Sequence, residues 1–286
     1  MVWRCGVATQ NQIRVRRVAF RYSAGTLDRH YVKGDLIMSH MVAVLSAVFP
    51  EGEEFFIRSV QHFSAQVTEP ELQAAVRGFT GQEVTHGREH RILNDQLYEM
   101  GYPTRGIEWL VQKYLSRVFR HMPKLYSLAL TAALEHFTAA GAETLLEDPE
   151  ARELLGDTEV RSILLWHALE ESEHKAVAFD VYRVAGGTET MRIWTMRLLI
   201  AGGMATLFCA TAISMLRDRA TYNPIRLIRS INTVWHSPFF SRQFLVRIRE
   251  YNRVGFHPND IDRTELVRTW QEKLFGEEGA LADHLK

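Results

Sequence analysis

Two segments that lie far apart in the chain carry the same short pattern, Glu-x-x-His. The pairs are Glu83 with His86 and Glu171 with His174. Residues three apart on an α-helix share a face, so each pair can offer a carboxylate and an imidazole to the same metal ion. Both segments lie within long stretches of helical periodicity. The fold must therefore bring two long helices side by side so that the two pairs can face each other.

Helical periodicity also dominates the rest of the chain, and no run of alternating apolar and polar residues predicts a strand. Proline and glycine residues divide the pattern into segments. We expect helices over 35–49, from 50 through 63, and over 70–100, 107–121, 125–146, 158–184 and 188–219, followed by shorter helices in 224–286. This pattern predicts an all-α protein.

A single carboxylate lies in the middle of one apolar helical segment. Glu135 has Leu128, Leu130, Leu134 and several alanines around it in the sequence. A buried carboxylate is costly unless it is paired or bound to a metal ion. We therefore expect Glu135 to be a metal ligand.

The helix that begins at Pro50 should supply a fourth carboxylate, from Glu51, Glu53 or Glu54. Glu53 best shares the inward apolar face, and Glu54 is the reserve. Glu51, near the helix N-terminus, is favoured as a surface residue. The resulting order is Glu, Glu-x-x-His, Glu, Glu-x-x-His on four successive long helices. It predicts a ferritin-like four-helix bundle with additional C-terminal helices, built around two metal ions.

Two more histidines fall on the stripes that face the expected metal ions. His167 precedes Glu171 by four residues, and His90 follows His86 by four. Each is either a third imidazole ligand or a residue that holds a carboxylate in place. We favour the supporting role for His90, whereas spacing alone leaves both roles open for His167. Glu170 is a further supporting or reserve residue.

A rival interpretation uses part of the same segment. His86, Glu89 and His90 fit His-x-x-Glu-His, the inverted zinc-peptidase pattern, in which two histidines bind zinc and the glutamate is the general base. This interpretation gives no shared role to Glu83 and the second segment, 166–174. We therefore rank it below the site with two metal ions.

At these residues the chain resembles a bacterial family of predicted metal-dependent hydrolases that has a ferritin-like character. The matching sequence motifs are Phe49-Pro50-Glu51-Gly52-Glu53 with Phe55-Phe56, Gln82-Glu83 with His86 and His90, Trp166-His167, Glu170-Glu171, Glu173-His174-Lys175 and Gly255-Phe256-His257-Pro258. The resemblance covers most of residues 20–262.

The order of ligands is also similar to that of the di-iron arylamine N-oxygenases, which add a histidine at the position of His167. This resemblance implies a set of seven metal ligands, namely Glu53, Glu83, His86, Glu135, His167, Glu171 and His174. The chain departs from that group in its loop spacings and its long C-terminal extension. The resemblance therefore covers the metal site and not the amine substrate.

A mixture of carboxylates and imidazoles suits iron or manganese, whereas zinc and copper sites favour more nitrogen or sulfur. The leading hypothesis is an enzyme with two metal ions, iron first and manganese second. It would activate dioxygen to oxidise an apolar or aromatic small molecule, with electrons from an unidentified donor. The alternatives are a hydrolase of an ester or phosphoester, which could use zinc, and a non-catalytic metal-binding protein with a ferritin-like fold.

Charge and hydropathy divide the chain into four parts. These are a basic N-terminal arm (1–33), the di-metal bundle (34–187), a long apolar helix (188–222) and a C-terminal helical extension (223–286). The 34 basic residues balance 34 acidic residues, which argues against the concentrated positive field of a nucleic-acid-binding protein. Two distant cysteines, and an N-terminal stretch without the apolar core of a signal peptide, predict a cytoplasmic location.

Residues 198–216 contain no charge and would form about 28 Å of helix, just enough to cross a bilayer core. Two glycines and several hydroxyl residues make the run only modestly apolar. We favour a helix that packs on the bundle or forms a homodimer contact. The alternative is attachment to the inner face of the membrane or a channel for an apolar substrate, and the arginine-rich stretch 217–253 supports it.

Overall fold

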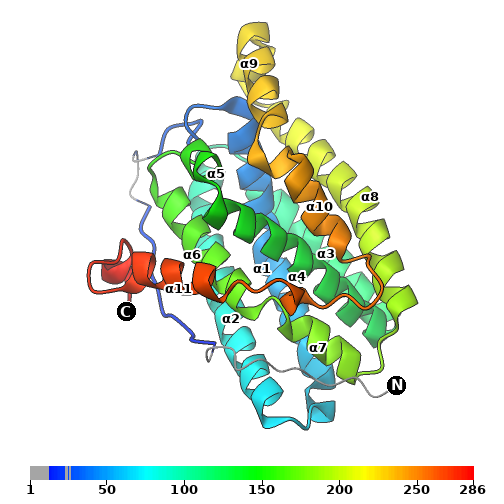
Figure 1. Cartoon of the computed structure of the whole chain (residues 1–286). Helices are drawn as coiled ribbons and strands as arrows, with labels where there is room; N and C mark the ends of the chain where they lie inside the picture. The colour runs from blue at the N-terminus through cyan, green and yellow to red at the C-terminus, as the bar shows by residue number, and fades with distance from the viewer. Residues whose placement is uncertain (1–12, 23–24, 26) are drawn as a thin grey trace.

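The computed structural model describes residues 13–22, 25 and 27–286, and it confirms the all-α fold. The described residues contain no strand beyond an isolated bridge between Val18 and Leu285. In chain order the helices are α1 (Leu36–Phe63), α2 (Pro70–Glu99), α3 (Thr104–His121), α4 (Lys124–Glu147), α5 (Pro149–Leu154), α6 (Glu159–His174), α7 (Val177–Val184), α8 (Glu189–Met215), α9 (Pro224–Trp235), α10 (Arg242–Glu250) and α11 (Thr264–Phe275). Figure 1 shows the long helices gathered into one bundle, with α8 along its side and α9 projecting at one end.

The core of the bundle is divided by a polar layer. Helix α1 packs against α2, α3, α4 and α8, and α4 packs in turn against α6, α7 and α8. One buried apolar cluster contains Leu93 and Trp166, and a second contains Phe56 and Phe79. Along α2 the second cluster precedes the segment 82–90 and the first follows it. The candidate ligands therefore lie between two apolar cores, which hold the four helices at fixed distances.

The expected break at Pro50 is wrong, because α1 runs through this proline without interruption. Proline has no N–H, so the carbonyl of Ser46, four residues earlier, loses its helical donor. The side chain of Asn94 on α2 replaces that donor, with Nδ2 3.0 Å from the Ser46 carbonyl oxygen. A hydrogen bond from a distant helix thus allows α1 to stay continuous, and nothing near Pro50 in the sequence reveals it.

The single helix expected over 158–184 is also divided, since α6 ends at His174 and α7 begins at Val177. Lys175 lies at this break. Its buried ammonium group is 2.9 Å from a carboxylate oxygen of Glu143 on α4. The sequence contains no glycine or proline here, so no local signal predicts the break.

The described part of the predicted basic arm lies on the bundle. The Phe20 N–H donates to the Glu89 carboxylate on α2, and the Arg14 carbonyl accepts a hydrogen bond from Gln82. Residues 1–12, 23, 24 and 26 of that arm lie outside the described residues. The four-part division of the chain and the finer ferritin-like assignment stay predictions.

Candidate metal centre

Four helices bring the seven predicted ligands together in the polar layer. Each of the seven residues is at most 4% exposed. Helix α1 carries Glu53, α2 carries Glu83 and His86, α4 carries Glu135, and α6 carries His167, Glu171 and His174.

The ligand atoms form two neighbouring groups. In each group they lie within 4.8 Å of one another; one group is Glu53, His86 and His167, and the other is Glu83, Glu171 and His174. His174 Nε2 lies 3.1 Å from Glu83 Oε1 and 3.4 Å from Glu135 Oε2, so the carboxylate of α4 joins the second group. His86 Nδ1 lies 3.8 Å from Glu83 Oε1, which links the two groups. This arrangement suits two metal ions side by side.

The first imidazole, His86, is oriented by Glu170 on α6. Its Nε2 lies 3.1 Å from Glu170 Oε2, and once that carboxyl group is ionised it can only accept a hydrogen bond. The proton of the neutral ring is then on Nε2, so the lone pair of Nδ1 faces the centre. Nδ1 is buried and makes no hydrogen bond with any residue that the structure describes.

The second imidazole, His167, is oriented by a chain of hydrogen bonds that begins on α1. The Ser46 hydroxyl donates to Asn94 Oδ1, at 2.7 Å, so its oxygen accepts from His90 Nδ1, at 2.9 Å. His90 Nε2 must then accept from His167 Nδ1, at 2.8 Å. This leaves the lone pair of His167 Nε2 directed at Glu171, 3.0 Å away. A nitrogen that faces a carboxylate at this distance needs a proton between them in the metal-free chain or a metal ion in the loaded chain. The geometry therefore favours His167 as a ligand and His90 as its support.

The third imidazole, His174, is oriented by Gln82. The amide nitrogen of Gln82 donates to the Arg14 carbonyl and to Glu173, at 3.1 and 2.8 Å. Its oxygen therefore accepts from His174 Nδ1, at 2.9 Å. When the ring is neutral, Nε2 carries a lone pair that faces Glu83 and Glu135. When the three rings are neutral, each imidazole thus presents an unprotonated nitrogen to the centre of the polar layer.

The carboxylates in this layer lack the partners that buried charges need. Both oxygens of Glu53, Glu83 and Glu135 are buried and without a hydrogen bond to any described residue. Burial and the neighbouring carboxylates raise the pKa of Glu53 and Glu83 well above the ordinary value, and that of Glu135 to about 7. Divalent cations would supply the missing partners, and seven oxygen and nitrogen donors without a thiolate suit them. The residues present therefore fit two such ions.

Glu171 and His174 show the opposite behaviour because they form an ion pair in the metal-free chain. Burial opposes the charge of Glu171, but hydrogen bonds with His167 and His174 hold its pKa well below the usual range. Burial also opposes the charge of His174, but Glu135 and Glu171 raise its pKa well above that of free histidine. A proton on His174 thus occupies the place that a metal ion would take.

Metal binding is therefore expected to release protons and to become tighter as the pH rises through 7 and 8. The Glu135 pKa is about 7, burial raises the Glu170 pKa to about 8, and His174 is protonated, so protons compete with the metal below these values. Calorimetric titrations in two buffers with different ionisation enthalpies measure this release. Identical heats in both buffers would show that no proton leaves.

One guanidinium group supports two of the three imidazoles. Arg16 donates to Glu170 at 3.0 Å and to both oxygens of Glu173 at 2.6 and 2.8 Å. Glu170 holds His86 directly, and Glu173 holds His174 through Gln82. Spacing arguments missed Arg16 because it lies in the N-terminal segment, which carries no helical pattern. Only the folded chain places it beside α6.

Gly87 leaves room for the Glu53 carboxylate where α1 and α2 meet. A methyl group at this position would lie 3.0 Å from Glu53 Oε2. In Gly87→Ala we expect the metal-free chain to be no less stable, because alanine favours a helix over glycine by up to about 1 kcal/mol. Metal affinity should fall about tenfold, as for other changes that move a ligand.

Gly141→Ala on α4 is the matched control, since a methyl group there would meet no atom within 4 Å. Isothermal titration of both variants, beside thermal melts, checks this prediction. Equal metal affinities in the two variants would contradict the close approach at Glu53.

The structure places two candidate residues away from the centre. Glu54, the reserve ligand, has its side chain 55% exposed and 4.0 Å from Arg58, so the structure brings Glu53 and not Glu54 to the centre. Glu89, the base of the zinc-peptidase interpretation, accepts hydrogen bonds from the Phe20 N–H and from Arg88. Its carboxylate serves the N-terminal segment, which argues against that interpretation.

Comparison with known proteins bears on the same residues. A family model described as predicted metal-dependent hydrolase matches residues 14–262, a range that includes Arg16, all seven candidate ligands and the helices that carry them. No curated protein and no solved structure matches the chain.

Proposed function

We propose that this chain, which belongs to the family of predicted metal-dependent hydrolases, uses two metal ions to hydrolyse an ester or a phosphoester. The observation that carries the proposal is the set of buried ligand atoms of Glu53, Glu83, Glu135 and His86 that make no hydrogen bond with any described residue. The ions, when bound, would lower the pKa of water and polarise a carbonyl or phosphoryl oxygen.

The protein contributes orientation and protection from bulk water. Glu170 and Gln82 keep protons on the outer nitrogens of His86 and His174, so the inner nitrogens stay available. Aromatic rings close the layer: Phe79 meets His174 edge-on at 5.0 Å between centroids, and Trp166 meets His86 at 4.8 Å. These rings separate the two imidazoles from bulk water.

Hydrolysis is tested with the full chain loaded under strict anaerobiosis with zinc, manganese or ferrous iron. Chromogenic carboxylic esters and phosphoesters are the probes, and Glu171→Gln is the matched control because it keeps the shape of a ligand and removes its charge. We expect turnover that depends on the metal and is lost in the control. Turnover no faster than that of the control, with every metal, would overturn the proposal.

The donor set itself favours a second candidate, an oxygenase with two iron ions. Four carboxylates and three imidazoles in the order described are similar to those of the di-iron arylamine N-oxygenases. Oxidation of an apolar substrate would need dioxygen and an external electron donor. Oxygen consumption by the ferrous-loaded chain, with no anaerobic ester turnover, would favour this candidate. If a chain that holds two ions shows neither activity, metal binding remains as its proposed role.

A further inference from the structure

Helix α8 covers the bundle but is itself mostly uncovered. It is the one helix in the described part of the chain that is long and apolar enough to cross a membrane, yet only 17% of its most apolar stretch is buried. Its buried residues lie near its two ends, at 192–196 and 211–215. Leu199 and Ile200 pack partly against the core, but much of the middle of this apolar helix is exposed.

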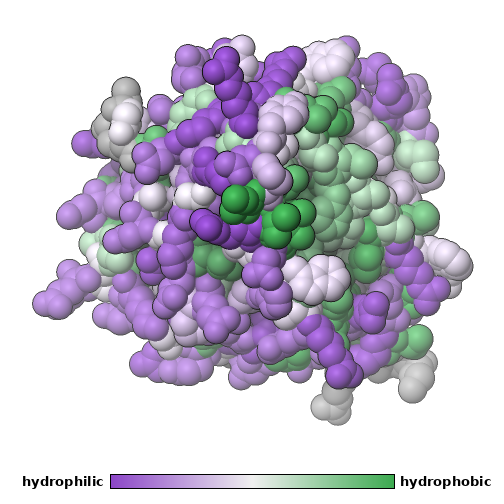
Figure 2. Space-filling model, turned by 90° about the horizontal axis from the view of Figure 1, so that it is seen from above, coloured by the Kyte–Doolittle hydropathy of each residue, from purple (hydrophilic) through white to green (hydrophobic). Residues whose placement is uncertain are grey.

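The exposed side chains form one apolar surface that continues onto α9. The stripe consists of Trp194, Leu198, Phe208 and Ile213 on α8 and of Leu216, the residue that follows this helix. On α9 it consists of Ile225, Ile228, Ile231 and Trp235, which are between 52% and 77% exposed. Figure 2, which views the molecule from above, shows hydrophobic residues gathered on one side of this face, with hydrophilic residues around them. We call these nine residues the α8–α9 surface. Apolar surfaces of this extent mark interaction sites.

The charges around the α8–α9 surface have a single sign. Between residues 190 and 249 the only acidic residue is Asp218, and it is buried. Arg217, Arg219 and Arg229 are exposed and form no ion pair with any residue in the described part of the chain. Positive charge beside apolar and aromatic side chains is typical of helices that lie in the interface of an anionic bilayer.

A second copy of the chain suits this surface poorly. In a two-fold dimer the same patch meets itself, so the arginines of one copy would face those of the other without an acidic partner. Lipid phosphates supply that partner, and Trp194, Tyr222 and Trp235 have the amphipathic rings that favour the headgroup region. We propose that the α8–α9 surface docks the protein onto an anionic membrane.

Both ends of α8 are tied to the protein, so the helix lies along the membrane rather than across it. At its N-terminal end the fully buried Arg192 donates to the backbone carbonyls of Tyr251 and Arg253. At its C-terminal end Ser214 lies 2.7 Å from His40 Nδ1 on α1. Crossing the bilayer would break these buried hydrogen bonds.

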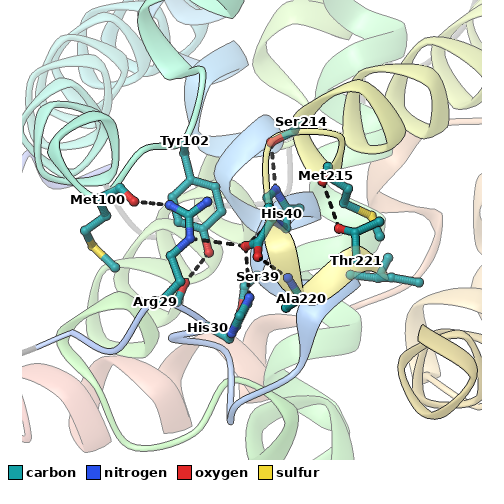
Figure 3. A network of polar contacts seen from close by, with 12 residues as sticks. Arg29, His30, Ser39, His40, Met100, Tyr102, Ser214, Met215, Ala220 and Thr221 are labelled. Carbon is teal, nitrogen blue, oxygen red and sulfur yellow. Dashed lines mark hydrogen bonds and ion pairs between the residues drawn. The ribbon is translucent and has the colours of Figure 1, made fainter. Parts of the chain in front are cut away.

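Figure 3 shows the network that fixes this second end, with His40 and Ser214 among its labelled residues. Asp218, which lies just beyond the end of α8, belongs to the same network. Asp218 Oδ2 lies within hydrogen-bond distance of Arg29, His30 and His40, at 3.1, 3.0 and 3.2 Å. Arg226 on α9 can only donate, so it donates to His30 Nδ1, and the ring proton of His30 is on the nitrogen that faces Asp218. The cluster is thus a hydrogen-bond network that joins α8 and α9 to α1, not a second metal site.

The test uses flotation of the full chain with vesicles of phosphatidylcholine alone and with vesicles that also contain phosphatidylglycerol. We expect binding to the anionic vesicles that weakens as salt is added. Ile228→Asp should bind at least about tenfold more weakly. The substitution replaces an apolar side chain that would contact the membrane with a negative charge, which anionic lipids repel. Val84→Asp, an equally exposed position on α2 among arginines, should bind like the unmodified chain.

Three outcomes would overturn the proposal. One is the absence of binding to anionic vesicles, and another is equal binding of Ile228→Asp at unchanged metal content and melting temperature. The third is a stable dimer in light scattering that Ile228→Asp dissociates, which would assign the surface to a second copy. Because none of these measurements depends on turnover, failure of the proposed hydrolysis leaves the membrane test intact.

Discussion

Replacement of Glu135 by leucine is expected to stabilise the metal-free chain and to abolish the stabilisation that metal ions provide. Glu135 is buried, neither of its oxygens makes a hydrogen bond with a described residue, and it shares its neighbour His174, 3.4 Å away, with Glu83 and Glu171. Without metal it therefore costs folding free energy. Removing such a group should add about 1–3 kcal/mol to the free energy of unfolding. The unmodified chain should gain about 2.7 kcal/mol at a metal concentration of one hundred times Kd, and the variant should gain much less.

Glu143→Leu is the matched control on the same helix. Glu143 is buried as well, but Lys175 and Arg263 lie 2.9 and 3.0 Å from its oxygens. Its removal leaves a buried ammonium group unpaired and should cost about 3–5 kcal/mol. Denaturant titrations with and without metal measure both variants. A Glu135→Leu chain that is destabilised like the control, and still responds to metal, would contradict the assignment of Glu135.

Replacement of Arg16 by glutamine should weaken both metal binding and folding, although Arg16 touches no candidate ligand. Its side chain is only 10% exposed and compensates two buried carboxylates, Glu170 and Glu173. Loss of the guanidinium group should cost about 3–5 kcal/mol of stability. It should also lower metal affinity about 10–100-fold, because His86 and His174 lose the groups that orient them.

Arg17→Gln provides the control for this prediction, since Arg17 is the exposed neighbour of Arg16 in the same segment. Arg16→Lys should recover part of the stability but less of the affinity, because an ammonium group cannot hold both carboxylates in the same fixed geometry. Calorimetric titration with metal separates the two effects. Equal affinities of Arg16→Gln and Arg17→Gln would refute the supporting role of Arg16.

The amino-acid sequence predicts most of the metal layer because its residues follow helical spacing. Glu-x-x-His places two groups on one face, and the choice of Glu53 over Glu54 needs only the direction of the neighbouring apolar residues. The side chain of Glu54 is indeed at the surface, and Glu53 is buried. The role of His167 could not be decided in this way, because it depends on a hydrogen-bond chain from Ser46 through His90.

The features that sequence reasoning missed all depend on contacts between distant segments. Asn94 satisfies the carbonyl that Pro50 leaves free, and Lys175 turns to Glu143 at the end of α6. Arg16 reaches α6 from a segment without regular structure. The uncharged helix was expected to pack on the bundle or to form a homodimer contact. Helix α8 does pack on α1 and α4, yet much of its middle is exposed. Hydropathy measures how apolar a helix is, but it does not show which residues of α8 are covered by α1 and α4.

The most direct test of the dinuclear centre is anomalous diffraction from crystals of the full chain grown with manganese or iron. We expect two peaks about 3.5–4 Å apart in the polar layer, one beside Glu53, His86 and His167 and the other beside Glu83, Glu171 and His174. A single peak, no peak in this layer, or a peak at His30, His40 and Asp218 instead would contradict the account.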